Sequence, residues 1–171
     1  MELTGREFWG IIHGMGAGAV FLLAFAGGLA GLWSLRPGLV TEAGIVERAR
    51  RLKIGTWIMA TAAWVTVLTG TWIVYPWYRD AADPNSPKNL LLASPKTADW
   101  HNFGMEWKEH IAWIAPLIAT AVAFGVAYYG KELIKRQEVR RGLMAFFTLA
   151  VVIAAIAGLF GALITKVKPV M

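Results

Sequence analysis

The chain has 171 residues, of which 57% are hydrophobic and only 16% are charged. A soluble domain of this length does not need so much apolar sequence, so the composition indicates an integral membrane protein. There are no cysteines, which excludes disulfides, thiolate metal sites, iron–sulfur clusters and thioether-attached haem. The formal net charge is +6, but the basic residues cluster beside apolar segments, which indicates membrane topology rather than nucleic-acid binding.

Four apolar segments are long enough to cross a bilayer as helices. They cover residues 8–33, 54–75, 105–130 and 143–164. We therefore predict an all-α membrane protein, an up-down-up-down bundle of four transmembrane helices, with residues 1–171 forming a single integral membrane domain. The first segment lacks a clear small-residue cleavage site, so we expect it to be retained rather than removed as a signal peptide.

The loops predict the orientation of the bundle. The connections after helices 1 and 3 are basic, with Arg36, Arg48, Arg50, Arg51 and Lys53 in one and Lys131, Lys135, Arg136, Arg140 and Arg141 in the other. The positive-inside rule places both connections in the cytoplasm, which leaves both termini and the loop 77–104 outside. We expect a multi-pass protein of the bacterial or archaeal inner (plasma) membrane, with a long outer loop of the kind that carries function.

All three histidines, His13, His101 and His110, fall at the outer end of this predicted bundle. An imidazole inside hydrocarbon is costly and marks a functional site by default. His13 and His110 lie at about the same depth, roughly 7–8 Å into helices 1 and 3 at about 1.5 Å per residue. Those two helices are expected to be diagonal, with axes roughly 14 Å apart. Two inward-pointing imidazoles at that separation can hold one metal centre between them.

Three interpretations of these histidines stay open. The first is one haem b, or more, held by His13 and His110 in a wide apolar cavity. The second is a non-haem metal site made of His110, Glu106 and either His13 or His101. The third is a cofactor-free accessory or assembly subunit, whose histidines bond to hydroxyls or carbonyls of neighbouring helices and whose glycine rows pack against partner helices.

Other residues near the same boundary have supporting roles in these interpretations. Nine residues separate His101 from His110, which places them on opposite faces of a continuous helix, so His101 is expected in a loop or at the interface and is a spare candidate ligand. Glu106 lies four residues before His110 and shares its face, as a metal ligand or a partner of the imidazole does. Haem propionates need cationic partners, and the basic residues within reach are Arg6, Arg79 and Lys108.

Several short motifs are similar to those of known membrane haemoproteins. They are His13 early in helix 1, Arg50-Arg51-Leu52-Lys53, Trp107-Lys108-Glu109-His110 at the start of helix 3, and Val167-Lys168-Pro169. With them the chain resembles small four-helix b-type membrane haemoproteins, and distantly the bacterial membrane protoporphyrinogen oxidase family and the related copper-resistance membrane domains. The resemblance implies haem binding by His13 and His110. Helix 3 ends Tyr128-Tyr129-Gly130 where that group has a histidine before the glycine, so the enzymatic activity is not carried over.

The cytoplasmic half of the bundle contains no histidine and no carboxylate expected to be buried. A second haem stacked across the membrane therefore has no ligands there, and a single outer centre suits exchange with a quinone or with an external redox partner. We predict a membrane b-type cytochrome that relays electrons within a larger redox complex, rather than an independent enzyme. Its expected partners are the lipid bilayer and other membrane or periplasmic redox subunits.

Overall fold

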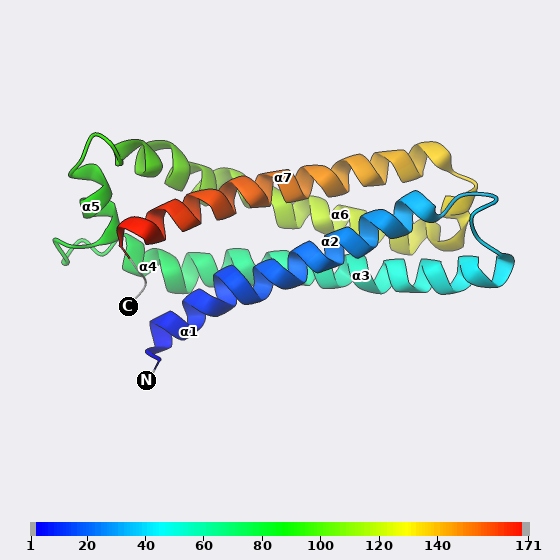
Figure 1. The fold of residues 1–171 in the computed structure, drawn as a ribbon, viewed down its shortest axis with the longest axis horizontal. Helices are drawn as coiled ribbons and strands as arrows, with labels where there is room; N and C mark the ends of the chain where they lie inside the picture. Colours follow the sequence, from blue (N-terminus) through cyan, green and yellow to red (C-terminus); the bar gives the residue numbers. More distant parts are fainter. Residues whose placement is uncertain (1–2, 169–171) are drawn as a thin grey trace.

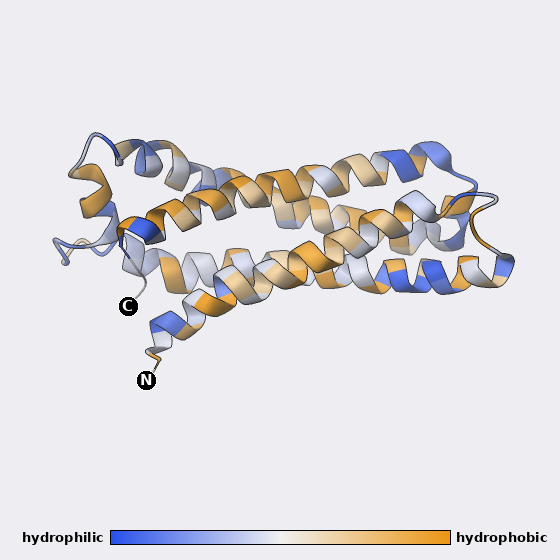
Figure 2. Cartoon of the chain, viewed as in Figure 1, coloured by the Kyte–Doolittle hydropathy of each residue, from blue (hydrophilic) through white to orange (hydrophobic). Residues whose placement is uncertain are grey.

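A computed structural model describes residues 3–168, which form a long helical bundle (Figure 1). Four helical spans are long and apolar enough to cross a membrane: Gly5–Ser34, Glu42–Tyr78, Trp100–Ile134 and Gln137–Val167. Apolar residues dominate the middle of the bundle and polar residues gather at its two ends (Figure 2). The first span starts, and the fourth ends, at the same end of the bundle (Figure 1). Pro169, the last residue of the terminal motif, lies outside the described residues.

Three of the spans are built from more than one helical segment. The first contains α1 (Gly5–Ile11), η1 (Ile12–Gly16) and α2 (Ala17–Ser34). The second contains α3 (Glu42–Thr69), η2 (Gly70–Val74) and α4 (Tyr75–Tyr78). The third contains η3 (Trp100–Met105), η4 (Trp107–Ile111), α6 (Ile114–Tyr129) and η5 (Gly130–Ile134). The fourth is the continuous helix α7 (Gln137–Val167). Segments η1 to η4 are π-helical, and η5 is a 3₁₀-helix.

The predicted up-down-up-down arrangement is confirmed. Consecutive spans pack against each other, α2 on α3, α3 on α6 and α6 on α7, and α7 closes the ring against α2. The first and third spans therefore lie on one diagonal of the bundle, as the sequence argument required. A hydrogen bond between neighbouring spans adds to the packing, because the indole Nε1 of Trp64 donates to Thr120 Oγ1 at 3.0 Å.

The main core lies between the spans and uses many small side chains. Its buried alanines are Ala60, Ala62, Ala63, Ala119, Ala123 and Ala150. Small residues allow helices to approach closely where lipid gives no hydrophobic driving force between them. One such close approach is at Gly28, where a Cβ atom would lie 2.6 Å from Cε1 of Phe147. Only glycine therefore allows α2 to pack on the Phe147 ring of α7.

The predicted helix limits were wrong at the end of the bundle opposite to the chain termini, where the two basic connections lie. We call this the basic end. The second span starts at Glu42 rather than at 54, so most of the basic residues assigned to its preceding loop lie on α3. Thr41 caps this helix by accepting a hydrogen bond from the Gly44 N–H at 3.2 Å. The fourth span likewise starts at Gln137 rather than at 143. Apolar runs in the sequence do not reveal these first helical turns, because their residues are polar and lie beyond the apolar part of each span.

The predicted outer loop, residues 77–104, was too long. The second span continues to Tyr78 and the third begins at Trp100, so the connection is residues 79–99 and contains α5 (Pro87–Leu92). Pro87 occupies the first turn of α5, where its missing N–H costs nothing. A small apolar cluster of Tyr78, Leu91, Met105 and Ile164 is buried beneath this connection. It attaches α5 to the ends of the last three spans.

Arginines at the basic end bond to the last carbonyls of two helices, α2 and η5. Arg48 Nη1 donates to the Ser34 carbonyl at 3.2 Å, at the end of α2. Arg140 Nη1 donates to the carbonyls of Leu133 and Ile134 at 2.9 and 3.3 Å, at the end of η5. Terminal carbonyls have no partner within their own helix, so these contacts satisfy them. The basic residues thus stabilise the two short connections as well as marking topology.

Candidate cofactor site at the histidine end

The winding of three spans changes from α- to π-helical at one end of the bundle, which we call the histidine end. His13 lies in η1, His101 in η3 and His110 in η4, so every histidine of the chain is in a π-helical segment. Such segments are rare and are frequently found at functional sites. The π-helical segment of the second span, η2, begins at Gly70 beside His13.

His13 is half-buried against the second span. Its Nδ1 lies 2.8 Å from the Thr66 carbonyl oxygen and 3.3 Å from Thr69 Oγ1. A carbonyl only accepts hydrogen bonds, so Nδ1 carries the proton and donates it, and Nε2 keeps its lone pair. The ring lies directly on Gly70, where a Cβ atom would be 2.7 Å from His13 Cε1. A histidine whose Nδ1 donates to a carbonyl is in the tautomer that coordinates metals through Nε2.

Lys108 extends from the third span towards α7. Its Nζ donates to the Ala157 carbonyl at 3.1 Å. Gly161 on the same helix, α7, leaves room for the ammonium, because a Cβ atom there would lie 3.0 Å from Nζ. A lysine inside a membrane bundle is costly and marks a functional site by default.

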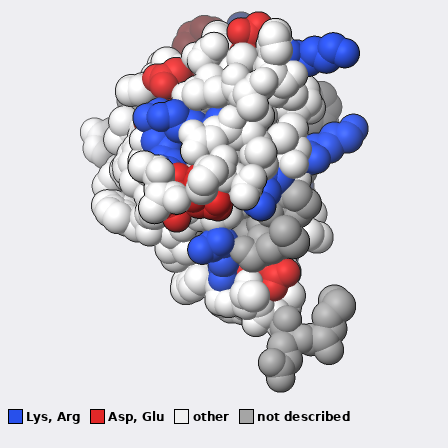
Figure 3. Space-filling view, turned by 90° about the vertical axis from the view of Figure 1, so that its left-hand side faces the viewer, with Lys and Arg blue, Asp and Glu red and all other residues white. Residues whose placement is uncertain are grey.

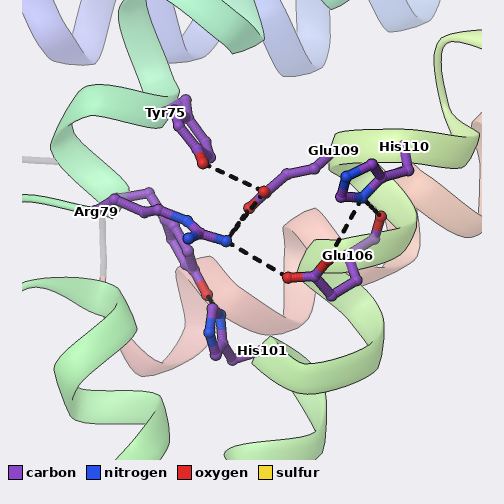
Figure 4. Close-up of polar contacts among 7 residues, drawn as sticks. Tyr75, Arg79, His101, Glu106, Glu109 and His110 are labelled. Atoms are coloured by element: carbon purple, nitrogen blue, oxygen red, sulfur yellow. Dashed lines mark hydrogen bonds and ion pairs between the residues drawn. The ribbon is translucent and has the colours of Figure 1, made fainter.

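An ion pair joins the second and third spans at this end (Figure 4). Arg79 Nη2 lies 2.9 and 3.0 Å from the two carboxylate oxygens of Glu109, and the Tyr75 hydroxyl donates to Glu109 Oε2 at 3.2 Å. The side chains of Arg79 and Glu109 are 32% and 15% exposed. Burial alone lowers the pKa of Arg79, but the bonds and charge of Glu109 raise it above its ordinary value. The guanidinium is therefore charged at any physiological pH.

His110 and Glu106 lie at the rim of the same network. His110 Nδ1 is 3.1 Å from the Glu106 carbonyl oxygen and 3.4 Å from its carboxylate, and the His110 side chain is 68% exposed. The structure thus brings together the pair predicted from its four-residue spacing. It does not bring His110 into contact with His13. Within residues 3–168, His110 bonds to its own helix and His13 bonds to α3.

Of the two positions predicted for His101, a loop or the interface, the structure excludes the loop. His101 is 8% exposed in the first turn of η3, because the third span begins before it. Its Nδ1 lies 2.7 Å from the Tyr78 hydroxyl, and the two rings pack with centroids 5.9 Å apart (Figure 4). This buried pair ties the ends of the second and third spans together. The Tyr78–His101 pair shares no residue with the contact between His13 and Thr66.

Arg6 is exposed in α1 at the same end of the bundle. An apolar groove of about 580 Å³ runs between the first two spans, from Ile12, next to His13, towards Lys53. Its volume is within the range of small-molecule pockets, roughly 300–1,000 Å³. In the part of the chain that the structure describes, no three His, Cys, Asp or Glu side chains are grouped so as to hold a metal ion. The non-haem alternative therefore has only the rim pair of Glu106 and His110.

Three features of this site had no signal in the sequence. The Thr66 carbonyl is backbone, and every residue has one. The choice of Glu109 as the partner of Arg79 depends on the packing of two spans. The positions of the π-helical segments depend on the same packing. Only Gly70 left a trace, as a glycine within an apolar span.

The surface at the histidine end carries both signs of charge, with Lys and Arg side chains beside Asp and Glu (Figure 3). Comparisons of the chain with protein-family models, with curated proteins and with solved structures found no match. The function is therefore inferred from the residues of this end themselves.

Proposed function

We propose that this protein is a b-type cytochrome of the membrane, which binds haem at the histidine end and relays electrons there. The observation that carries the proposal is the bond from His13 Nδ1 to the Thr66 carbonyl. It fixes the ring and leaves Nε2 as a ligand, which is how proteins prepare an axial histidine. Bound haem would supply one-electron redox chemistry, and the residues of the chain supply its position and its electrostatic surroundings.

His13 is the better supported of the two proposed ligands. His110 has the same tautomer, because its Nδ1 also faces a carbonyl, that of Glu106, and its Nε2 keeps the lone pair. Its side chain is exposed at the rim, so we assign it as the second ligand, more easily exchanged than the first. Lys108, which bonds to the Ala157 carbonyl inside the bundle at this end, is the cation proposed to pair with a haem propionate. Arg6, at the surface of the same end, is a second candidate for that role.

The Arg79–Glu109 pair has a positioning role in this proposal. Arg79 follows the second span, which holds His13 in place, and Glu109 is adjacent to His110 in the third span. Their two short contacts fix the ends of these spans relative to one another. The separation of the two proposed ligands is thereby set by a charge-assisted bond rather than by loop flexibility.

The proposed orientation follows from the opposite end. It carries ten Lys and Arg residues against four Asp and Glu, which by the positive-inside rule faces the cytoplasm. The haem would then lie near the outer face of a bacterial or archaeal plasma membrane. There it would exchange electrons with membrane or periplasmic redox subunits of a larger complex.

A visible spectrum tests the proposal. The protein, purified in mild detergent, should show a Soret band and an α-band in the reduced-minus-oxidised spectrum. His13→Ala should abolish both bands. His110→Ala should keep the haem but change it from six-coordinate low spin to five-coordinate high spin, and His101→Ala should leave the spectrum unchanged. If haem is supplied during expression and the protein folds but stays colourless, the proposal is overturned in favour of a cofactor-free subunit.

A matched pair of glycine variants tests the role of His13 without removing it. An added Cβ at Gly70 would meet the His13 ring, whereas one at Gly55 in the same span would meet nothing within 4 Å. Gly70→Ala should therefore shift the Soret band or weaken haem retention, and Gly55→Ala should do neither. Equal spectra for the two variants would contradict the assignment of His13 as a ligand.

A further inference from the structure

A second cavity lies at the basic end of the bundle, between α2 and α3. Its volume is about 350 Å³, and the residues that matter for its shape and charge are Gly27, Gly31, Gly55, Arg48 and Arg51. A Cβ atom at Gly27 or at Gly55 would meet nothing within 4 Å. These two glycines therefore face open space, and close helix packing does not explain them.

The two arginines give this cavity a charged mouth. Arg48 is held by its bond from Nη1 to the Ser34 carbonyl. A guanidinium has five N–H donors, so this bond positions the side chain without using up its capacity to bind an anion. Arg51 pairs with Glu47 through Nε at 2.6 Å, and its side chain is 76% exposed. The remainder of its guanidinium can reach a ligand at the membrane surface.

We propose that this cavity binds an anionic phospholipid of the surrounding bilayer, with its phosphate at Arg48 and Arg51 and an acyl chain in the glycine-lined space. Basic pockets between transmembrane helices at the membrane edge recognise anionic headgroups in this way. Arginine suits the phosphate because its planar fork matches two phosphate oxygens. The proposal concerns the end of the bundle remote from the histidines and does not depend on haem binding.

The shape of the cavity favours a lipid over a soluble anion. Beyond the arginines its walls are apolar or glycine, and Gly27 and Gly31 lie in the apolar part of the first span. A free phosphate ion would use the arginines and leave this space without an occupant. A lipid fills both parts, because its headgroup carries the charge and its chain is apolar.

Native mass spectrometry of the detergent-purified chain tests the proposal with two lipids, phosphatidylglycerol and phosphatidylcholine. The anionic lipid should remain bound about thirtyfold more tightly than the zwitterionic one, as expected for two arginines near a membrane surface. The double variant Arg48→Gln/Arg51→Gln should remove this preference. Lys131→Gln/Lys135→Gln makes the same charge change in the other connection at this end and should keep it. Equal binding of the two lipids, or equal loss in both variants, would overturn the proposal.

A steric variant keeps the arginines and closes the cavity. Gly27→Leu/Gly55→Leu adds side chains where there is open space, so the fold should be retained, with a melting temperature close to that of the parent. It should lose the bound phosphatidylglycerol. Gly142→Leu/Gly158→Leu adds the same side chains at open positions of α7 and should keep it. Retention of the lipid by the filled variant, or its displacement by millimolar inorganic phosphate, would show that no acyl chain occupies the cavity.

Discussion

The two ends of the bundle are built on different principles. At the histidine end three spans contain π-helical segments, and the described residues carry seven Lys and Arg against six Asp and Glu. At the basic end the spans are α-helical except for the 3₁₀-helix η5, and there are ten basic residues and four acidic ones. Arginines there bond to the carbonyls that end the helices, whereas Arg79 at the histidine end bonds to a carboxylate.

This difference separates the part that packs from the part that carries polar chemistry. The main core, with Gly28 against Phe147, needs close contact between regular helices, and its buried residues are almost all apolar. The histidine end places a lysine, an ion pair and three imidazoles among the ends of the spans. Each requires a partner, and carbonyls, hydroxyls and carboxylates of neighbouring segments supply it. The irregular end can bind a cofactor because the regular remainder holds the spans together.

The largest expected effect is the loss of the ion pair at the histidine end. Arg79→Met leaves Glu109, whose side chain is only 15% exposed, without its cation. Removing one partner of a buried pair costs about 3–5 kcal/mol, and we expect about 3 because Arg79 keeps 32% of its exposure. The measurement is the free energy of unfolding in detergent.

The control for this variant is an exposed pair at the other end. Arg141 and Glu138 are 67% and 85% exposed, so Arg141→Met should change the free energy of unfolding by less than about 0.5 kcal/mol. The double variant Arg79→Met/Glu109→Gln should recover most of the loss, because it leaves no buried charge behind. If Arg79→Met were as mild as Arg141→Met, polar contacts would not stabilise the histidine end.

The second largest effect should come from steric packing in the main core. Gly28→Ala places a Cβ atom on the Phe147 ring, and overpacking of this kind costs roughly 1–3 kcal/mol. Gly27→Ala, one residue earlier and facing open space, should be neutral or stabilise the helix by up to about 1 kcal/mol. Adding Phe147→Leu to Gly28→Ala should restore part of the stability. Equal melting temperatures for the two alanine variants would mean that close packing at Gly28 does not stabilise the main core.

Much of the fold could be predicted from sequence, and the reasons are physical. Apolar runs of about twenty residues must cross the bilayer, and short connections make consecutive spans neighbours, so the diagonal of spans 1 and 3 followed. The site was harder to predict, because assigning a residue to a face assumes regular winding. A π-helical segment changes the rotation from residue to residue, so the side-chain directions expected for His101 and His110 were uncertain by a large angle. The partner of His13 is a carbonyl, which no motif records.

A smaller effect at the histidine end should come from the buried pair of Tyr78 and His101. Tyr78→Phe removes the hydroxyl that lies 2.7 Å from His101 Nδ1 and leaves that nitrogen without its partner. A lost buried hydrogen bond of this kind costs about 1–3 kcal/mol, and we expect about 1 because the rings still pack. Tyr128→Phe, whose side chain is 83% exposed, should have no effect on unfolding. Identical stabilities would mean that packing alone holds His101.

The smallest expected effect is at the hydrogen bond between Trp64 and Thr120, in the spans between the two ends. Thr120→Val keeps the shape of the side chain but removes the acceptor of the Trp64 indole N–H. Interhelical hydrogen bonds in membranes contribute only about 0.6 kcal/mol on average. The contribution is small because the same polar groups also find hydrogen-bond partners in the unfolded chain. Thr165→Val is the matched control, since the Thr165 hydroxyl donates only to carbonyls of its own helix. A loss in Thr120→Val larger than that of Tyr78→Phe would mean that polar contacts stabilise the regular part of the bundle as much as the histidine end.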